Sequence, residues 1–295
     1  MSIFKANDIR GIYGKELHDK DAYALGNVFV QFTRKKQIVV GRDNRISSPA
    51  LHKSIIRGVT DAGSDVLDIG VIDSPGLYFA SHYFKKPAIM ITASHNPSTH
   101  NGFYLCKAHG VSIYSKNGLK EIEKLVKHNK PMLSRKKGKI INKNIWINYV
   151  NHILSFVDTK KINKCNLVVD AGNGVGTIVA QKVFASFPEA KINKLYFNLD
   201  GSFPNRGPDT TIEKNLKYIK NKVKNIKADM GLAFDGDADR VAFVDEKGAI
   251  IEGSLIGALL AKHILKKTQE NKKIVYTVGC SRIVPEIIKK NKGIP

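Results

Sequence analysis

The sequence has few cysteines and no long apolar segment. Its three cysteines, Cys106, Cys165 and Cys280, lie far apart and form no Cys-x-x-Cys pair, which argues against a disulfide framework and a thiolate zinc site. No stretch approaches the roughly 18 continuous apolar residues of a membrane span, and the first residues contain no apolar core of a secretion signal. We therefore expect a cytoplasmic protein in a reducing compartment, with no membrane partner.

Acidic residues are also scarce, since 26 Asp and Glu stand against 48 Lys and Arg and the formal net charge is +22. Such an excess raises the question of a nucleic acid or an anionic membrane as partner. Arginine, whose planar guanidinium reads bases and phosphates, supplies only 9 of the 48, and the lysines are spread through the chain. We take the charge as a property of the general surface and predict no nucleic-acid partner.

Elements of secondary structure alternate along the chain of 295 residues. Short β-rich runs followed by stretches of helical spacing are typical of parallel or mixed sheets covered by helices on both faces. The first part predicts strands and helices in turn over 38–41, 49–62, 65–69, 75–83, 88–92 and 119–128. The polar, lysine-rich segment 129–144, broken by Pro131 and Gly138, indicates a linker.

A second series follows the linker and a third begins near Gly253. The second predicts helices over 145–156 and 213–222 and strands over 167–169 and 231–234. The third predicts helices over 254–265 and 284–290 around a strand over 274–278. It stops about where a further strand should enter, so we expect this last unit to be incomplete.

The most informative motif is Asp235-Gly236-Asp237-Ala238-Asp239-Arg240, directly after a strand. Three carboxylates at alternate positions repel one another unless a cation lies between them, and Mg²⁺ prefers oxygen ligands. An EF-hand fails here because Arg240 stands where that loop needs glycine and 241–244 has a strand pattern. A solvated acidic turn is the simple alternative to a metal site.

A second motif, Thr92-Ala93-Ser94-His95-Asn96-Pro97, lies at the carboxyl end of a strand, where open α/β sheets place their ligands. The Asn-Pro pair predicts a turn that presents the Ser94 hydroxyl outward, next to His95. Serine is a weak nucleophile until a base or a metal activates it. An ordinary polar loop is the alternative, whereas a Ser-His-Asp hydrolase is disfavoured because Ser94 has no Gly-x-Ser-x-Gly context.

Two weaker signals favour structural roles. Gly172-Asn173-Gly174-Val175-Gly176-Thr177 follows a strand, but Thr177 replaces the third glycine of a dinucleotide-binding turn, so a tight turn is the better interpretation. In the loop after the strand 38–41, Arg42 and Arg45 could pair with Asp43 or reach a phosphate, and the pairing is favoured.

Taken together, several motifs resemble those of the α-D-phosphohexomutases, the phosphomannomutase/phosphoglucomutase family. The resemblance covers the whole chain and includes two highly specific motifs, those of Ser94 and of the acidic loop. The other segments that carry it are Asp8-Ile9-Arg10-Gly11, Gly41-Arg42-Asp43 with Ser47-Ser48-Pro49, Asn101-Gly102-Phe103, Phe203-Pro204-Asn205 and Cys280-Ser281-Arg282.

The resemblance implies a phosphohexomutase that interconverts hexose 1-phosphates and hexose 6-phosphates of mannose or glucose through a bound 1,6-bisphosphate. It implies a phosphoserine at Ser94 and Mg²⁺ held by Ser94, Asp235, Asp237 and Asp239. Arg10 and Arg240 would meet phosphate oxygens, and His95 would transfer a proton or orient a neighbour. The partners would be small hexose phosphates.

The resemblance also implies related three-layer α/β/α domains with mixed sheets around a central cleft. The expected division is residues 1–142 with the phosphoserine loop, 143–248 with the metal loop, and 249–295 as the start of a third domain. That third domain would be incomplete. The family's sugar-recognition loop and its fourth domain would both be absent.

Three positions depart from the family pattern. Tyr104 stands where the family usually has a lysine that acts as general acid or base, Asn7 replaces an aromatic residue, and Gly279 replaces a basic one. Loss of one such acid or base costs roughly 10²–10⁴ in rate. The alternative hypothesis is therefore a catalytically impaired paralogue or fragment that binds Mg²⁺ or sugar phosphate without turnover.

Overall fold

The first part of the chain forms a mixed seven-stranded sheet in the computed structural model, which describes residues 3–128, 130–162, 164–268 and 272–295. Its strands are β1 (Ile9–Ile12), β2 (Gln37–Arg42), β3 (Asp65–Val71), β4 (Ala88–Ile91), β5 (His100–Lys107), β6 (Val111–Ser112) and β7 (Ile140–Asn142). The order is β1-β5-β4-β2-β3-β7, with β6 paired to β5. Strand β5 runs antiparallel to both β1 and β4, whereas β4, β2, β3 and β7 are parallel.

Helices cover both faces of this sheet. Strand β2 is apolar without alternation because both of its faces are buried: Ile38 and Val40 belong to one apolar core and Val39 to the other. The first core includes residues of α1 (Asp19–Thr33), α2 (Ser48–Asp61) and α4 (Lys120–His128). The second core includes Leu77 and Ala80 of α3 (Ser74–Phe84).

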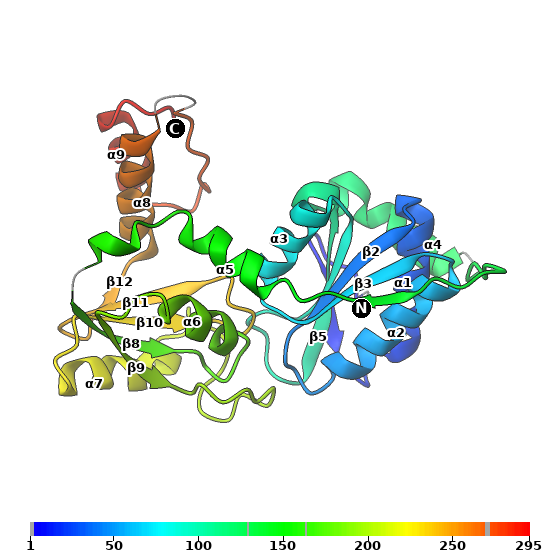
Figure 1. Ribbon diagram of the computed structural model, residues 1–295, viewed down its shortest axis with the longest axis horizontal. Coiled ribbons are helices and arrows are strands. Elements are labelled where there is room, and N and C mark those ends of the chain that lie inside the picture. The colour runs from blue at the N-terminus through cyan, green and yellow to red at the C-terminus, as the bar shows by residue number, and fades with distance from the viewer. Residues whose placement is uncertain (1–2, 129, 163, 269–271) are drawn as a thin grey trace.

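A second, five-stranded sheet follows, again with helices. Its strands are β8 (Cys165–Asp170), β9 (Ala190–Leu195), β10 (Met230–Phe234), β11 (Val241–Asp245) and β12 (Ile250–Ile251), in the order β12-β11-β10-β8-β9. The helices are α5 (Trp146–Leu154), α6 (Gly176–Phe184) and α7 (Lys217–Asn225). The chain thus contains two consecutive α/β/α domains with mixed sheets, side by side in Figure 1.

The two domains share an apolar core. Tyr149 of α5 and Val179 of α6 are buried in the same cluster as Leu77 of α3, and Ala238 of the acidic loop packs against that cluster. This shared core fixes the amino end of α3 against the second domain, which matters for the site described below.

The helices α8 (Gly253–Lys267) and α9 (Ile283–Lys290) form a small cluster of their own and stand away from both sheets (Figure 1). The strand predicted over 274–278 is wrong, because these residues form no ladder of strand pairing and Val275 and Val278 are fully exposed. A β-branched run becomes a strand only beside another strand. Here the pairing consists of an isolated bridge between Lys273 and Ile294.

The linker predicted over 129–144 is also partly wrong. Residues 140–142 form the edge strand β7, which pairs in parallel with β3, whereas residue 129 lies outside the described residues. The edge strand has three residues and is largely exposed, so it has no apolar periodicity that sequence reasoning could detect. The other strands and helices predicted in the first two series are confirmed to within a few residues.

Within the described ranges, no helix has the length and apolar character that a bilayer crossing requires.

Candidate active site

Two loops from different domains meet at the centre of the molecule. The Ser94 loop follows β4 and the acidic loop follows β10, so both lie at carboxyl ends of strands. The Ser94 hydroxyl donates a hydrogen bond of 3.1 Å to Asp235 Oδ2. A Cβ atom at Gly236 would lie 2.5 Å from the Ser94 carbonyl oxygen, so only glycine permits this close approach of the two backbones.

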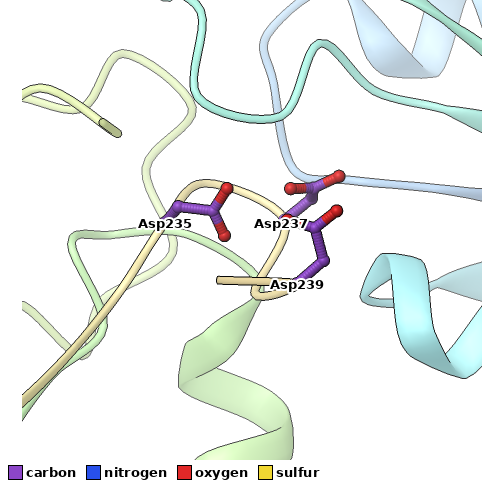
Figure 2. Close-up of side chains that lie close together, drawn as sticks. All are labelled: Asp235, Asp237 and Asp239. Atoms are coloured by element: carbon purple, nitrogen blue, oxygen red, sulfur yellow. The ribbon is translucent and has the colours of Figure 1, made fainter. Parts of the chain in front are cut away.

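The acidic loop gathers its three carboxylates in one place. Oxygen atoms of Asp235, Asp237 and Asp239 all lie within 4.8 Å of one another, and Figure 2 shows them on one tight loop. Asp235 and Asp237 are buried, whereas Asp239 is exposed. Burial, then the charges of Asp237 and Asp239, raises the pKa of Asp235 to about 8, and burial and Asp239 likewise raise the pKa of Asp237. Such a group could bind a divalent cation, whose charge would relieve the repulsion.

Ser94 is placed differently from the prediction of an outward hydroxyl. Its side chain is fully buried between the two domains, and its φ of 51° lies in the left-handed region, which a non-glycine residue adopts at some cost. The Asn96-Pro97 turn exists, but the acidic loop of the second domain covers the serine. A local sequence pattern predicts a turn and cannot show which distant segment packs over it.

Four of the predicted side chains line a cavity beside these loops, where the carboxylates of Asp8 and Glu16 also lie. Arg10, Arg240, His95 and Tyr104 all line this cavity of about 540 Å³, together with Lys5 and His100. The Arg10 guanidinium donates to Asn96 Oδ1 (2.5 Å) and to the Ala93 carbonyl (3.2 Å), and it also bonds the Tyr104 hydroxyl. Arg240 is exposed and its guanidinium lies 3.7 Å from Asp239. The structure therefore brings together all eight side chains that the sequence singled out.

Comparison with known proteins shows to which family this chain belongs. The family descriptions "Phosphoglucomutase/phosphomannomutase, alpha/beta/alpha domain I" and "domain II" match residues 1–132 and 147–248. The chain belongs to the phosphoglucomutase/phosphomannomutase family. A phosphomannomutase of Vibrio cholerae is 37% identical over 100% of this chain and 66% of its own length. A phosphoglucomutase of Neisseria meningitidis serogroup B is 36% identical over 99% of this chain and 63% of its own length.

Solved structures of the family share the fold. The chain superimposes on a phosphoglucomutase/phosphomannomutase family protein of Burkholderia thailandensis with a TM-score of 0.90 at 32% identity, covering 99% of this chain and 65% of that one. N-acetylphosphoglucosamine mutase of Aspergillus fumigatus, in complex with GlcNAc-6P and magnesium, has a TM-score of 0.50 at 19% identity and covers 88% and 46%. This chain spans 63 to 66% of the length of the two curated relatives.

Two titratable groups of the site, His95 and Tyr104, have shifted pKa values. Burial, and then the charge of Arg240, lowers the pKa of His95, so its imidazole is neutral at pH 7, with Nδ1 at 3.2 Å from Ser94 Oγ. Burial raises the pKa of Tyr104 although Arg10 opposes it. The Tyr104 phenol therefore stays protonated at neutral pH and is not suited to act as a general base.

Sequence reasoning missed that Arg45 supports the serine loop. The structural pair with Asp43 is confirmed, at 3.0 Å, and both side chains are buried. The guanidinium also donates to the carbonyl oxygens of four residues in and after that loop, Ser94, Asn96, Pro97 and His100. Because those carbonyls are distant in sequence, the loop Gly41-Arg42-Asp43-Asn44-Arg45 shows no sign of this function beyond its charges.

Arg206 plays a similar part in the second domain. It is buried, pairs with Asp170 at 2.9 Å and donates to the Phe234 carbonyl at 2.6 Å, directly before the acidic loop. The turn around Gly174 also supports that loop, since a Cβ there would lie 2.6 Å from the Gly236 carbonyl oxygen. This agrees with the prediction of a tight turn.

Replacing Asp235 by asparagine should stabilise the metal-free chain. A carboxyl group whose folded pKa of about 8 exceeds its unfolded value near 4 destabilises the fold as pH rises through that interval. Asp235→Asn should therefore raise the melting temperature without metal, more at pH 8 than at pH 5. With Mg²⁺ added, the wild-type chain should have the higher melting temperature of the two, because only its site binds the ion well.

The matched control for this experiment is Asp239→Asn, which removes the exposed carboxylate of the same loop and should change the metal-free melting temperature much less. Differential scanning fluorimetry in EDTA and in Mg²⁺ measures all three chains. A lower metal-free melting temperature for Asp235→Asn would contradict the electrostatic account of this loop.

Proposed function

We propose that the chain is the phosphoserine and metal-binding part of a phosphohexomutase that interconverts hexose 1-phosphates and hexose 6-phosphates of glucose or mannose. The observation that carries this proposal is the hydrogen bond between Ser94 Oγ and Asp235, which puts a hydroxyl at the edge of three converging carboxylates. The division into 1–142, 143–248 and 249–295 is proposed with one change: β12 (Ile250–Ile251) pairs with β11, so the second domain extends at least to residue 251. The cytoplasmic location stays a prediction.

The residues fit a divalent cation. Asp237 Oδ1 is buried and has no hydrogen-bond partner among the residues that the structure describes, which is costly unless an ion occupies that direction. Asp235, Asp237, Asp239 and an oxygen on Ser94 would hold the ion, and we propose Mg²⁺ because all four are hard oxygen ligands. When bound, the cation would neutralise charge on the transferred phosphoryl group. In its own structure the Aspergillus mutase binds magnesium and a hexosamine phosphate.

The chain's own residues would act in two transfers. In the first, the Oγ–P bond of phosphorylated Ser94 breaks as a hydroxyl of the hexose monophosphate bonds to phosphorus, which gives the 1,6-bisphosphate; the sugar hydroxyl loses its proton and Ser94 Oγ takes one up. In the second, Ser94 Oγ bonds to the phosphorus of the other phosphate of the reoriented bisphosphate while the bond from that phosphorus to the sugar oxygen breaks; the sugar oxygen takes up a proton and the Ser94 hydroxyl proton leaves. His95 Nδ1, neutral and 3.2 Å away, is within reach of that proton.

The cavity would hold the substrate's phosphate by charge. Arg10 and Arg240 line it from opposite domains and supply fixed positive charges. Tyr104, protonated at neutral pH, would act as a hydrogen-bonding group, already linked to Arg10. A small anionic sugar suits this cavity better than a nucleic acid or a membrane surface does.

The proposal is tested by phosphate transfer to the chain. Incubation with glucose 1,6-bisphosphate or mannose 1,6-bisphosphate and Mg²⁺ should add one phosphate, seen by intact-mass spectrometry, and EDTA should prevent it. Omission of the bisphosphate is the control. A chain that stays unmodified at all bisphosphate concentrations, although it is folded and binds Mg²⁺, would contradict the proposed function.

A second candidate is a catalytically impaired paralogue that binds phosphosugar and metal. The raised pKa of Tyr104 favours it, because the phenol cannot supply the base that the family's usual lysine offers. This candidate predicts phosphate uptake or sugar-phosphate binding without conversion of glucose 1-phosphate or mannose 1-phosphate in a coupled assay. Ordinary turnover by the full-length protein would exclude it.

A further inference from the structure

The amino end of α3, in the first domain, contacts the acidic loop of the second. Ser74 is the first residue of this helix and is 1% exposed. Its backbone N–H donates to the Asp237 carbonyl at 3.1 Å, and its hydroxyl donates to Asp237 Oδ2 at 2.5 Å. One residue thus binds both the backbone and the side chain of a proposed metal ligand, although 163 positions separate them in the sequence.

These bonds make the two carboxylate oxygens of Asp237 different from each other. Oδ2 accepts the Ser74 hydroxyl and, at 3.4 Å, the Thr92 hydroxyl. Within the described part of the chain, Oδ1 has no hydrogen-bond partner although the side chain is fully buried. Because a carboxylate is planar, a short bond that holds Oδ2 also fixes the direction of Oδ1. The buried, unpartnered oxygen is the one left for a cation.

The position of Ser74 is itself fixed by neighbouring contacts. The preceding residue, Asp73, is buried and accepts the Tyr149 hydroxyl of α5 at 2.7 Å, which ties the start of α3 to the second domain. The helix has 11 residues, so its amino end carries the partial positive charge that favours a nearby carboxylate. Ser74 is therefore held in place before any ion binds.

We propose that Ser74 is a positioning residue of the metal site, which orients Asp237 so that Oδ1 faces the cation. The inference rests on the proposed function's metal site. It means that cation affinity depends on the contact between the domains, because the residue that orients one ligand comes from the first domain and the three carboxylates come from the second. Partners that orient metal ligands typically contribute roughly 10- to 100-fold to metal affinity.

The test compares Mg²⁺ and Mn²⁺ affinity, by isothermal titration calorimetry, between the wild-type chain and Ser74→Ala. The dissociation constant should rise roughly 10- to 100-fold in Ser74→Ala. Ser74→Thr, which keeps a hydroxyl, should restore an affinity close to the wild-type value, and this rescue would not be expected if the side chain merely filled space. Ser74→Cys has a similar shape, but its thiol is a weak hydrogen-bond donor, so its metal affinity should lie between those of Ser74→Ala and Ser74→Thr.

The matched control is Ser81→Ala, in the same helix. Ser81 is also fully buried, but its hydroxyl bonds the Lys86 and Lys107 carbonyls and does not contact the acidic loop. Its loss should lower the melting temperature and leave metal affinity unchanged. If Ser74→Ala fails to fold, the contrast between the threonine and cysteine variants decides the question.

The outcomes separate this inference from the function on which it rests. A wild-type chain without affinity for Mg²⁺ or Mn²⁺ would contradict the proposed metal site and this inference with it. A wild-type chain that binds metal, with Ser74→Ala or Ser74→Cys of equal affinity, would overturn the inference alone and leave the proposed function standing.

Discussion

Replacing Ser94 by alanine should abolish phosphate uptake from a hexose 1,6-bisphosphate, whereas the wild-type chain gains one phosphate. The change removes the hydroxyl that lies 3.1 Å from Asp235 and 3.2 Å from His95. The loss should be complete, because a covalent step has no partial substitute. Intact-mass spectrometry, with peptide mapping of the wild-type product, measures the result.

Ser98→Ala is the control for this experiment, since Ser98 lies in the same loop, is only partly buried and lines a neighbouring cavity. It should take up phosphate like the wild-type chain. Phosphorylation of Ser94→Ala to the wild-type extent, or a phosphate mapped to another residue of the wild-type chain, would show that Ser94 is not the acceptor.

Replacing Arg45 by methionine should unfold or strongly destabilise the first domain. Methionine fills much of the volume but leaves the Asp43 carboxylate buried without its cation, and removing one partner of a buried ion pair costs about 3–5 kcal/mol. It also removes four hydrogen bonds to carbonyl oxygens that hold the serine loop. Urea unfolding followed by circular dichroism should show a large fall in the midpoint.

Arg42→Met provides the comparison, because Arg42 is only partly buried and its guanidinium donates to the Asp43 carbonyl at 3.0 Å. Its effect should be about 1 kcal/mol, the contribution of an ordinary hydrogen bond. Arg45→Lys keeps the charge but lacks the planar fork, so it should recover part of the stability and little of the loop geometry. Equal midpoints for Arg45→Met and Arg42→Met would contradict the role of Arg45.

Much of this arrangement could be predicted from the sequence because it depends on local patterns. Strands such as β2 and β4 are short apolar runs, and the motifs of Ser94 and Asp235 follow directly after strands. Since strand ends of α/β sheets carry ligand sites, both loops could be assigned to one edge of each sheet. The three carboxylates then indicated a metal site, with a solvated acidic turn as the alternative, and the metal-assisted transfer at Ser94 followed from the resemblance to the phosphohexomutases.

The parts that escaped prediction depend on contacts between distant segments. Arg45 and Ser74 look like ordinary loop residues, and only the folded chain shows that one supports the serine loop and the other orients Asp237. Ser94 is buried because the second domain covers it. The apolar run 274–278 is not a strand because it has no neighbour, and β7 is a strand because β3 lies beside it. Pairing and burial are tertiary facts that a local pattern does not contain.

The central claim is that Ser94 and the acidic loop form one metal site across the contact between the two domains. A crystal of the phosphorylated chain soaked in Mn²⁺ tests it most directly, through an anomalous difference map. The account predicts one strong peak within coordination distance of Asp235, Asp237, Asp239 and a phosphate oxygen on Ser94. A peak elsewhere, or a peak bound by the carboxylates with the Ser94 phosphate turned away, would contradict it.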